Sequence, residues 1–285
     1  MSSTGVVQLG YLRWRSPHVA AWKEIFRCIG AGEFELPQRE LRAQLDSGQY
    51  RLAVEVADTS GAVELAWEVE GPAEFDEALK ALTDAGARPE VRGDLLDERG
   101  VEGLARFQDP NGVTSELYWG RAGGSADGRA HPPGEIHFVS SRSGFGHVTY
   151  AVSDYDATRD FYMRTLGLRI SDVNWVGEHK ICFLKCNSRH HSFAFLEGPG
   201  PCSLRHAMVE VESIDDLGIA RDRLLDAGVS LERDLGRHAS DGMLSFYVHT
   251  PEKWLLEVGT SGGSRSEADF RGRATAVHPW GHRRI

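Results

Sequence analysis

The chain has 285 residues and a formal net charge of −10, with lysines and arginines scattered along its length. This length suffices for two domains that each bury a core, and the acidic balance argues against a surface that binds nucleic acid. The first residues do not resemble a signal sequence, and no stretch approaches the ~20 apolar residues that a membrane-spanning helix needs. We therefore expect a cytoplasmic protein that binds neither nucleic acid nor membranes.

The first half of the chain alternates apolar stretches typical of strands with two amphipathic stretches typical of helices. The expected strands cover residues 7–12, 50–56, 65–69, 103–108 and 114–119. The expected helices cover residues 20–30 and 75–83. Between the last two strands, Asp109-Pro110-Asn111-Gly112 is typical of a hairpin turn. A polar segment, to which no strand is assigned, follows the first helix.

A segment rich in glycine, alanine, serine and proline, residues 120–134, separates this half from a second half with the same order of elements. Two motifs recur 142 positions later (209 minus 67 and 226 minus 84): Trp67-Glu68-Val69-Glu70 as Val209-Glu210-Val211-Glu212, and Asp84-Ala85-Gly86-Ala87 as Asp226-Ala227-Gly228-Val229. Recurrence at one offset indicates two homologous domains. We place them at residues 1–120 and 141–285, with a linker at residues 121–140.

Each half contains strands and amphipathic helices in the order strand, helix, strand, strand, strand. This order predicts the α+β class, in which each domain consists of paired βαβββ modules with a curved mixed sheet and helices on one face. The concave face of such a sheet stays uncovered. It would offer a cavity lined by side chains from several strands.

Two stretches in the second half carry histidines that could share such a cavity. Residues 187–195 and 205–211 alternate apolar and polar residues on either side of the turn Gly198-Pro199-Gly200-Pro201, so we expect two strands that each begin near a histidine. Two imidazoles that point into one cavity are suited to a metal site. Because neighbouring residues of a strand face opposite ways, His190 is expected to point away from His191.

Alignment of the two halves singles out three polar positions of the second half: His147 aligns with Tyr11, His206 with Glu64, and Glu257 with Glu116. Only the C-terminal half therefore has two histidines and a carboxylate at these positions. Two imidazoles and one carboxylate that leave other positions open are typical of non-haem Fe(II) centres that use dioxygen. A closed structural zinc site would need a fourth protein ligand, and none is evident. Glu116 itself is expected to lie in solvent at the end of a strand.

Motifs of the second half keep their order and approximate spacing in a known enzyme family: Gly144-Phe145-Gly146-His147, Asp160-Phe161-Tyr162, Asn187-Ser188-Arg189-His190-His191, Arg205-His206-Ala207-Met208, Leu235-Gly236-Arg237-His238, Ser245-Phe246-Tyr247, Leu256-Glu257-Val258-Gly259 and Trp280-Gly281-His282. On these motifs the chain resembles the two-domain type I extradiol catechol dioxygenases of the vicinal oxygen chelate superfamily, most closely the 2,3-dihydroxybiphenyl 1,2-dioxygenases. The resemblance covers nearly the whole chain and is strongest over residues 144–260. In the N-terminal half it is looser, and residues 34–47 look diverged.

The resemblance implies an oxidoreductase of aromatic catabolism, a homo-oligomer that cleaves a catechol ring and incorporates both atoms of O2. It implies Fe(II), with Mn(II) as the alternative, bound by His147, His206 and Glu257. It also implies that His191 is the acid/base residue and that Tyr247 donates a hydrogen bond to the ionised catechol oxygen. His238 and Asp241 should lie close by. These roles agree with general chemistry, since a cation lowers the pKa of a bound hydroxyl and a neutral histidine can accept its proton.

The expected substrate is a 3-substituted catechol such as 2,3-dihydroxybiphenyl, and five residues are expected to line its pocket: Phe183, Ala194, Thr149, Ser240 and Met243. Two other functions remain open at this point. A metal-dependent lyase or isomerase of the same superfamily usually has a different ligand set, so His206 argues against it. A non-catalytic protein that binds small molecules needs no acid/base residue, so His191 and Tyr247 argue against that.

Overall fold

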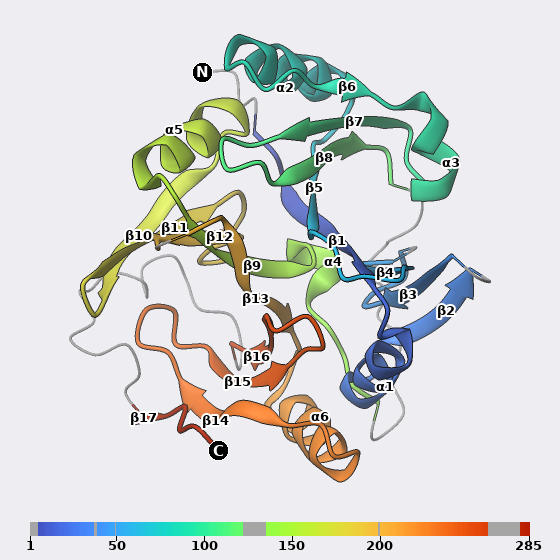
Figure 1. Ribbon diagram of the computed structural model, residues 1–285, viewed down its shortest axis with the longest axis vertical. Coiled ribbons are helices and arrows are strands. Elements are labelled where there is room, and N and C mark those ends of the chain that lie inside the picture. Colours follow the sequence, from blue (N-terminus) through green and yellow to red (C-terminus); the bar gives the residue numbers. More distant parts are fainter. Residues whose placement is uncertain (1–4, 37–38, 49, 122–134, 199, 262–279) are drawn as a thin grey trace.

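The computed structural model describes residues 5–36, 39–48, 50–121, 135–198, 200–261 and 280–285, which form two β-sheets with helices against them (Figure 1). The first half contains β1 (Gln8–Ser16), α1 (Val19–Ile29), β2 (Gly32–Leu36), β3 (Glu40–Gln44), β4 (Leu52–Val56), β5 (Glu64–Glu68), α2 (Pro72–Asp84), β6 (Glu90–Val91), the 3-10 turn η1 (Gly93–Leu95), α3 (Leu96–Arg99), β7 (Gly103–Gln108) and β8 (Thr114–Trp119). The second half contains α4 (Ser140–Ser143), β9 (Gly146–Val152), α5 (Tyr155–Thr165), β10 (Arg169–Val176), β11 (His179–Lys185), β12 (Phe193–Glu197), β13 (Ser203–Glu210), α6 (Ile214–Asp226), β14 (Leu231–Arg237), β15 (Leu244–His249), β16 (Leu255–Thr260) and β17 (Trp280–Gly281).

The two sheets have the same strand order, which confirms the predicted α+β class and the repeat. The first runs β2-β3-β4-β1-β5-β8-β7-β6 and the second β10-β11-β12-β9-β13-β16-β15-β14-β17. In the first sheet β1 is parallel to β4 and β5 is parallel to β8, and β1 and β5 form the antiparallel pair between them. In the second sheet β9 is parallel to β12 and β13 is parallel to β16, and β9 and β13 form the antiparallel pair. Each sheet is therefore two βαβββ modules joined at their first strands.

The halves share one hydrophobic core. Helix α1 packs against α6, and α2 packs against α5, so each long helix of the first half meets one of the second. Trp254 of the second half lies 5.2 Å from Trp22 and 5.4 Å from Trp14, measured between ring centroids. Most of the predicted linker, residues 122–134, lies outside the described residues, so the predicted domain boundaries remain a prediction.

The structure corrects the expected strands in two places. The polar segment after α1 forms the hairpin of β2 and β3, in which Glu40 and Arg42 are buried and paired with each other. Leu41 and Ala43 of β3 are buried on one face and Glu40 and Arg42 on the other, so charged residues lie at covered positions and obscure the short apolar pattern. The stretch 187–195 becomes a strand only at Phe193, and His191 lies in the preceding bends. His190 consequently does not point away from His191, since their Nδ1 atoms are 3.0 Å apart.

Gly146 allows the two central strands of the second sheet to approach closely. A Cβ atom at this position would lie 1.8 Å from the carbonyl oxygen of Met208 on β13, so any other residue would push β9 away from β13. The next residue of β9 is His147, whose position in the sheet therefore depends on this glycine.

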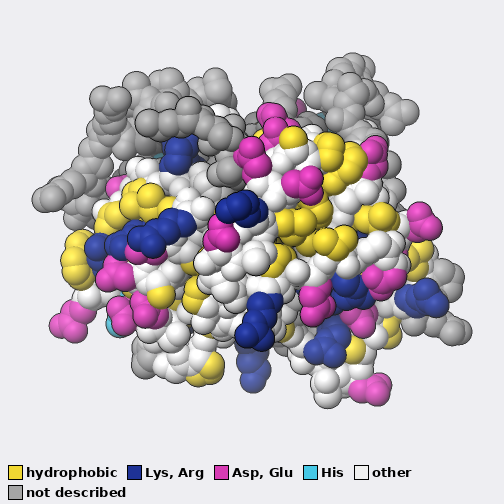
Figure 2. Space-filling view, turned by 90° about the horizontal axis from the view of Figure 1, so that it is seen from above, with side chains coloured by type: hydrophobic (Ala, Val, Ile, Leu, Met, Phe, Trp, Pro, Cys, Tyr) yellow, Lys and Arg dark blue, Asp and Glu magenta, His cyan; other side chains and the backbone are white. Residues whose placement is uncertain are grey.

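Figure 2 shows the molecule of Figure 1 from above. On this face, basic side chains lie among acidic ones. Among the helices of the described residues, none combines the length and the apolar composition needed to cross a bilayer.

Candidate metal centre

Strand register brings three polar side chains to one face of the second sheet. His147 on β9 and Glu257 on β16 both pair with Met208 on β13, so all three residues of this row face the same way. His206 precedes Met208 by two residues on β13 and therefore shares its face. His147 and Glu257 are only 4% and 1% exposed. The predicted ligands thus converge in the interior.

The three ligand atoms form a small triangle. The Nε2 atoms of His147 and His206 are 3.1 Å apart, and the Glu257 Oε2 atom lies 3.4 Å from the first and 3.3 Å from the second. A triangle of this size can place one ion at about 2.0–2.2 Å from every corner, the range that nitrogen and carboxylate ligands take around a divalent metal. The donor set therefore fits a single metal ion.

The protonation states suit metal binding as well. Burial lowers the pKa of His206 to about 3, so its imidazole is neutral and has a lone pair to offer. Burial alone would raise the pKa of the Glu257 carboxyl, but hydrogen bonds from His147 and His238 outweigh this and hold it well below its usual range. Glu257 is therefore a carboxylate, the form that binds cations.

His191 lies beside this triangle although it comes from a loop. Its ring centroid is 4.0 Å from that of His147 and 4.9 Å from that of Phe183. Burial, followed by the neighbouring His147, lowers the pKa of His191 well below its usual value. The imidazole is therefore neutral and can accept a proton.

Tyr247 and His238 lie on the other side of Glu257. Tyr247 on β15 pairs with Glu257 in the sheet, and His238 places its Nε2 atom 2.9 Å from the Tyr247 hydroxyl and 3.1 Å from the Glu257 Oε1 atom. Burial and then the charge of Glu257 raise the pKa of Tyr247 well above its usual value, so the hydroxyl keeps its proton. It can donate a hydrogen bond without adding charge.

A cavity of about 930 Å³ opens above these groups and takes its walls from both halves of the chain. Of the residues expected to line a substrate pocket, Thr149, Phe183 and Ser240 line this cavity, as does Asp241. Ala194 and Met243 are not among its lining residues. Ala194 lies between Thr149 and Phe183 in the sheet, where its short side chain is fully covered. Met243 instead approaches Gly259.

The structure places His282, near the C-terminal end of the given sequence, next to the site. Its ring centroid lies 4.5 Å from that of His238 and 5.5 Å from that of Tyr247, and its Nε2 atom is 3.0 Å from the carbonyl oxygen of Ser245. The only sequence signal was the motif Trp280-Gly281-His282. Nothing in that motif indicates that the end of the chain returns to the site.

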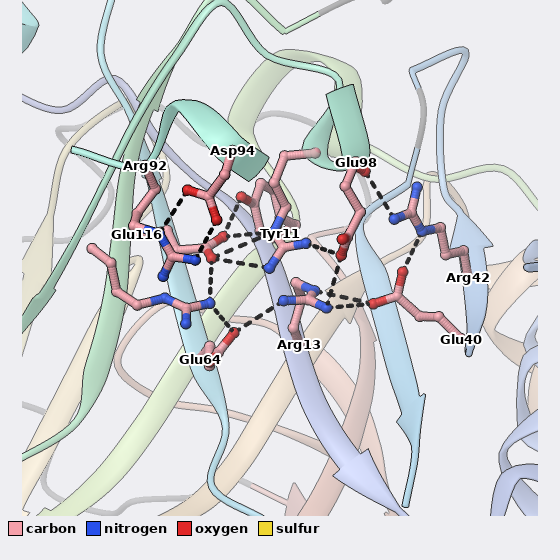
Figure 3. Close-up of polar contacts among 11 residues, drawn as sticks. Tyr11, Arg13, Glu40, Arg42, Glu64, Arg92, Asp94, Glu98 and Glu116 are labelled. Carbon is pink, nitrogen blue, oxygen red and sulfur yellow. Dashed lines mark hydrogen bonds and ion pairs between the residues drawn. The ribbon is translucent and has the colours of Figure 1, made fainter. Parts of the chain in front are cut away.

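The N-terminal half fills the equivalent position with ion pairs (Figure 3). Glu116 is fully buried, so the expectation that it lies in solvent is wrong. It accepts hydrogen bonds from the Tyr11 hydroxyl at 2.6 Å, Arg99 Nε at 3.1 Å and Arg106 Nη2 at 2.9 Å. Arg13 forms salt bridges with two further carboxylates, Glu64 at 3.1 Å and Glu40 at 2.7 Å. Within the described residues, the groups of side chains able to hold a metal both lie in the second half.

The chain is similar to known dioxygenases in both sequence and structure. Residues 144–258 match the Glyoxalase/Bleomycin resistance protein/Dioxygenase superfamily. The chain is 34% identical to an iron-dependent extradiol dioxygenase of Rhodococcus jostii, over 96% of each chain. It is 32% identical to a 3-methylcatechol 2,3-dioxygenase of Pseudomonas putida, over 98% of each chain. The crystal structure of a halotolerant catechol dioxygenase matches with a TM-score of 0.88 and 27% identity, over 99% of this chain and 96% of that one.

The ion pairs of Glu116 predict an acid-sensitive contribution to stability. Burial raises the pKa of its carboxyl, but Arg99 outweighs burial and lowers the pKa to about 2. A carboxyl with a depressed pKa stabilises the fold above its unfolded pKa and loses this contribution as the pH falls toward the folded value. Glu116→Gln should therefore lower the free energy of unfolding at pH 7 by roughly 3 kcal/mol.

Urea unfolding from neutral pH to about pH 2.5 measures this difference, which should shrink below about pH 4.3, the unfolded pKa of glutamate. The matched control is Glu70→Gln, since Glu70 is exposed and should show no change at any pH. A Glu116→Gln protein as stable as the wild type at pH 7 would contradict the stabilising role of the ion pairs.

Proposed function

The chain belongs to the ring-cleaving extradiol dioxygenases of the glyoxalase/bleomycin resistance protein/dioxygenase superfamily, and we propose that it binds Fe(II) and cleaves a 3-substituted catechol next to its substituent. The observation that carries the proposal is the triangle of His147, His206 and Glu257, with ligand atoms 3.1 to 3.4 Å apart at the base of a cavity. Fe(II) is preferred to Mn(II) because two imidazoles and one carboxylate with open positions are the ligand set typical of non-haem iron and dioxygen chemistry.

The side chains around the triangle have distinct tasks in this proposal. Bound Fe(II) would supply Lewis acidity toward the catechol hydroxyls and electrons toward dioxygen. His191, neutral and buried, accepts a proton from a catechol hydroxyl and later returns it. Tyr247 donates a hydrogen bond to the ionised substrate oxygen. His238 holds both Tyr247 and Glu257 in place through its Nε2 atom.

The proposal also covers location and subunit number: the enzyme acts in the cytoplasm and forms a homo-oligomer. All four cysteines are free thiols, as expected in a reducing compartment. Ile170, Val173 and Trp175 are exposed on β10, the edge strand of the second sheet, and such an apolar edge favours contact with another copy. Sedimentation of the purified protein measures the subunit number, and a monomer would contradict this part.

The ligand assignment predicts loss of metal in three variants. His147→Ala, His206→Ala and Glu257→Ala should each reduce bound iron from roughly one ion per chain to below roughly a tenth, since two protein ligands are too few to hold an exchangeable ion. Elemental analysis of folded protein after loading with Fe(II) and, separately, with Mn(II) provides the measurement. Activity restored by Mn(II) but not by Fe(II) would contradict the choice of iron.

The control for this series is Glu116→Ala, because Glu116 occupies the position of Glu257 in the N-terminal half. Its folded fraction should bind as much iron as the wild type. Iron retained at the wild-type level in all three ligand variants would show that the ligands lie elsewhere.

Removal of the acid/base residue should separate metal binding from turnover. His191→Gln should keep its iron and bind catechol, but kcat should fall on the order of 10²–10⁴-fold because only proton transfer is lost. Anaerobic titration of the iron-loaded variant with catechol measures binding, and the yellow ring-fission product formed after admission of air measures turnover. An unchanged kcat at saturating substrate would remove His191 from the mechanism.

Cavity size and lining predict the substrate preference. A cavity of about 930 Å³ has room for a substituent beside the diol, and Phe183, Ile181 and Leu204 give it apolar walls. Because a buried methyl group contributes about 0.8 kcal/mol and a phenyl group more, kcat/KM should exceed that for catechol by about fourfold for 3-methylcatechol and by more than about tenfold for 2,3-dihydroxybiphenyl. Should catechol or a 4-carboxylated catechol be the best substrate by a similar factor, the apolar pocket is not where the substituent binds.

A further inference from the structure

His190 is buried in the loop before β12 and contacts the acid/base residue directly. It is 4% exposed, and its Nδ1 atom lies 3.0 Å from the Nδ1 atom of His191. The two rings are perpendicular, and Phe183 lies against both, with centroids 5.4 Å from His190 and 4.9 Å from His191. The pair of rings is thus held in one arrangement by its surroundings.

This contact restricts where the proton of His191 can reside. A neutral imidazole has one N–H and one lone pair, so a hydrogen bond between two Nδ1 atoms requires one ring to donate and the other to accept. If His191 donates through Nδ1, its Nε2 atom carries the lone pair and can act as a base. If His190 donates instead, His191 Nε2 carries a proton and cannot accept another. The partner at Nδ1 therefore decides the chemical role of His191.

Asp241 adds a negative charge to the pair. One of its carboxylate oxygens lies within 4.8 Å of a ring nitrogen of each histidine, and the carboxylate is held by the backbone N–H of Met243 at 2.9 Å. A fixed carboxylate at this distance stabilises the positive charge that His191 gains with a second proton. In that state His191 still donates through Nδ1, so the bond to His190 persists and becomes charge-assisted.

We infer that His190 is a positioning residue for the ring-cleavage reaction: it accepts the Nδ1 hydrogen of His191 and so keeps the Nε2 lone pair of His191 available to the substrate. This inference rests on the proposed function, because it assigns a role within the same reaction. It extends that function to His190, which acts through His191 and not on the reacting atoms.

The test uses four variants of the iron-loaded enzyme: His190→Leu, His190→Asn, His191→Gln and the double variant His190→Leu/His191→Gln. With 3-methylcatechol, His190→Leu should keep its iron and a KM within about threefold of the wild type, while kcat falls about 10–100-fold, as for residues that orient a catalytic or ligating histidine. His190→Asn should recover most of kcat, because its amide oxygen can accept a hydrogen bond near the position of Nδ1.

The double variant separates positioning from packing. If His190 acts through His191, its removal should not slow the His191→Gln enzyme any further. An equal further loss of kcat in the double variant, a loss of iron in His190→Leu, or an unchanged kcat in His190→Leu would each overturn the inference. The matched control is His179→Leu, since His179 is exposed on β11 and should leave kcat unchanged.

Two further results keep the test decisive. If His190→Leu does not fold, His190→Gln replaces it, since its longer amide reaches the position of Nε2 rather than Nδ1 and should show the same slow kcat. If the iron-loaded wild type forms no ring-fission product from any catechol, the proposed function fails first. Turnover by the wild type together with a fully active His190→Leu overturns the positioning role alone.

Discussion

A buried carboxylate at the centre of each sheet is the constraint around which both halves are built. Glu116 and Glu257 occupy the same position on β8 and β16, and both are almost completely buried. An ionised carboxylate in the interior costs several kcal/mol unless a positive charge or several hydrogen bonds compensate it. The two halves meet this requirement with different partners, and the difference determines which half can carry chemistry.

In the first half the compensation is permanent. Arg99 and Arg106 bind Glu116 directly, and guanidinium groups stay charged at every physiological pH. These ion pairs occupy the place in the first sheet that the triangle of His147, His206 and Glu257 occupies in the second. In the second half Glu257 is surrounded by imidazoles, which offer lone pairs when neutral. In the proposed function, a bound cation supplies the counter-charge and the cavity beside Glu257 takes the substrate.

That His147, His206 and Glu257 share one face could be predicted from the sequence, because all three lie on strands, where the period of two and the repeat between the halves fix the face of each side chain. His191 was expected in the cavity because residues 187–195 read as a strand, but it lies in a loop without a period, so its acid/base role could be expected only from the family motif. The burial of Glu116 could not be predicted, because it depends on arginines from α3 and β7 that no local pattern links to it. Likewise, Glu40 and Arg42 are buried on one face of β3 while Leu41 and Ala43 are buried on the other, and the burial of such charged residues cannot be recognised from an apolar pattern.

The cavity wall has a consequence for how such an enzyme can diversify. Ser60–Val63 and Asn111–Val113 of the first half contribute to the same cavity as the histidines of the second. These loops carry no ligand and sit beside a sheet whose own interior is closed by ion pairs. Mutations in them can therefore reshape the entrance while the reacting centre stays under separate selection. The second half thus carries the polar groups of the site, while changes in the loops of the first half can alter which molecules fit the cavity.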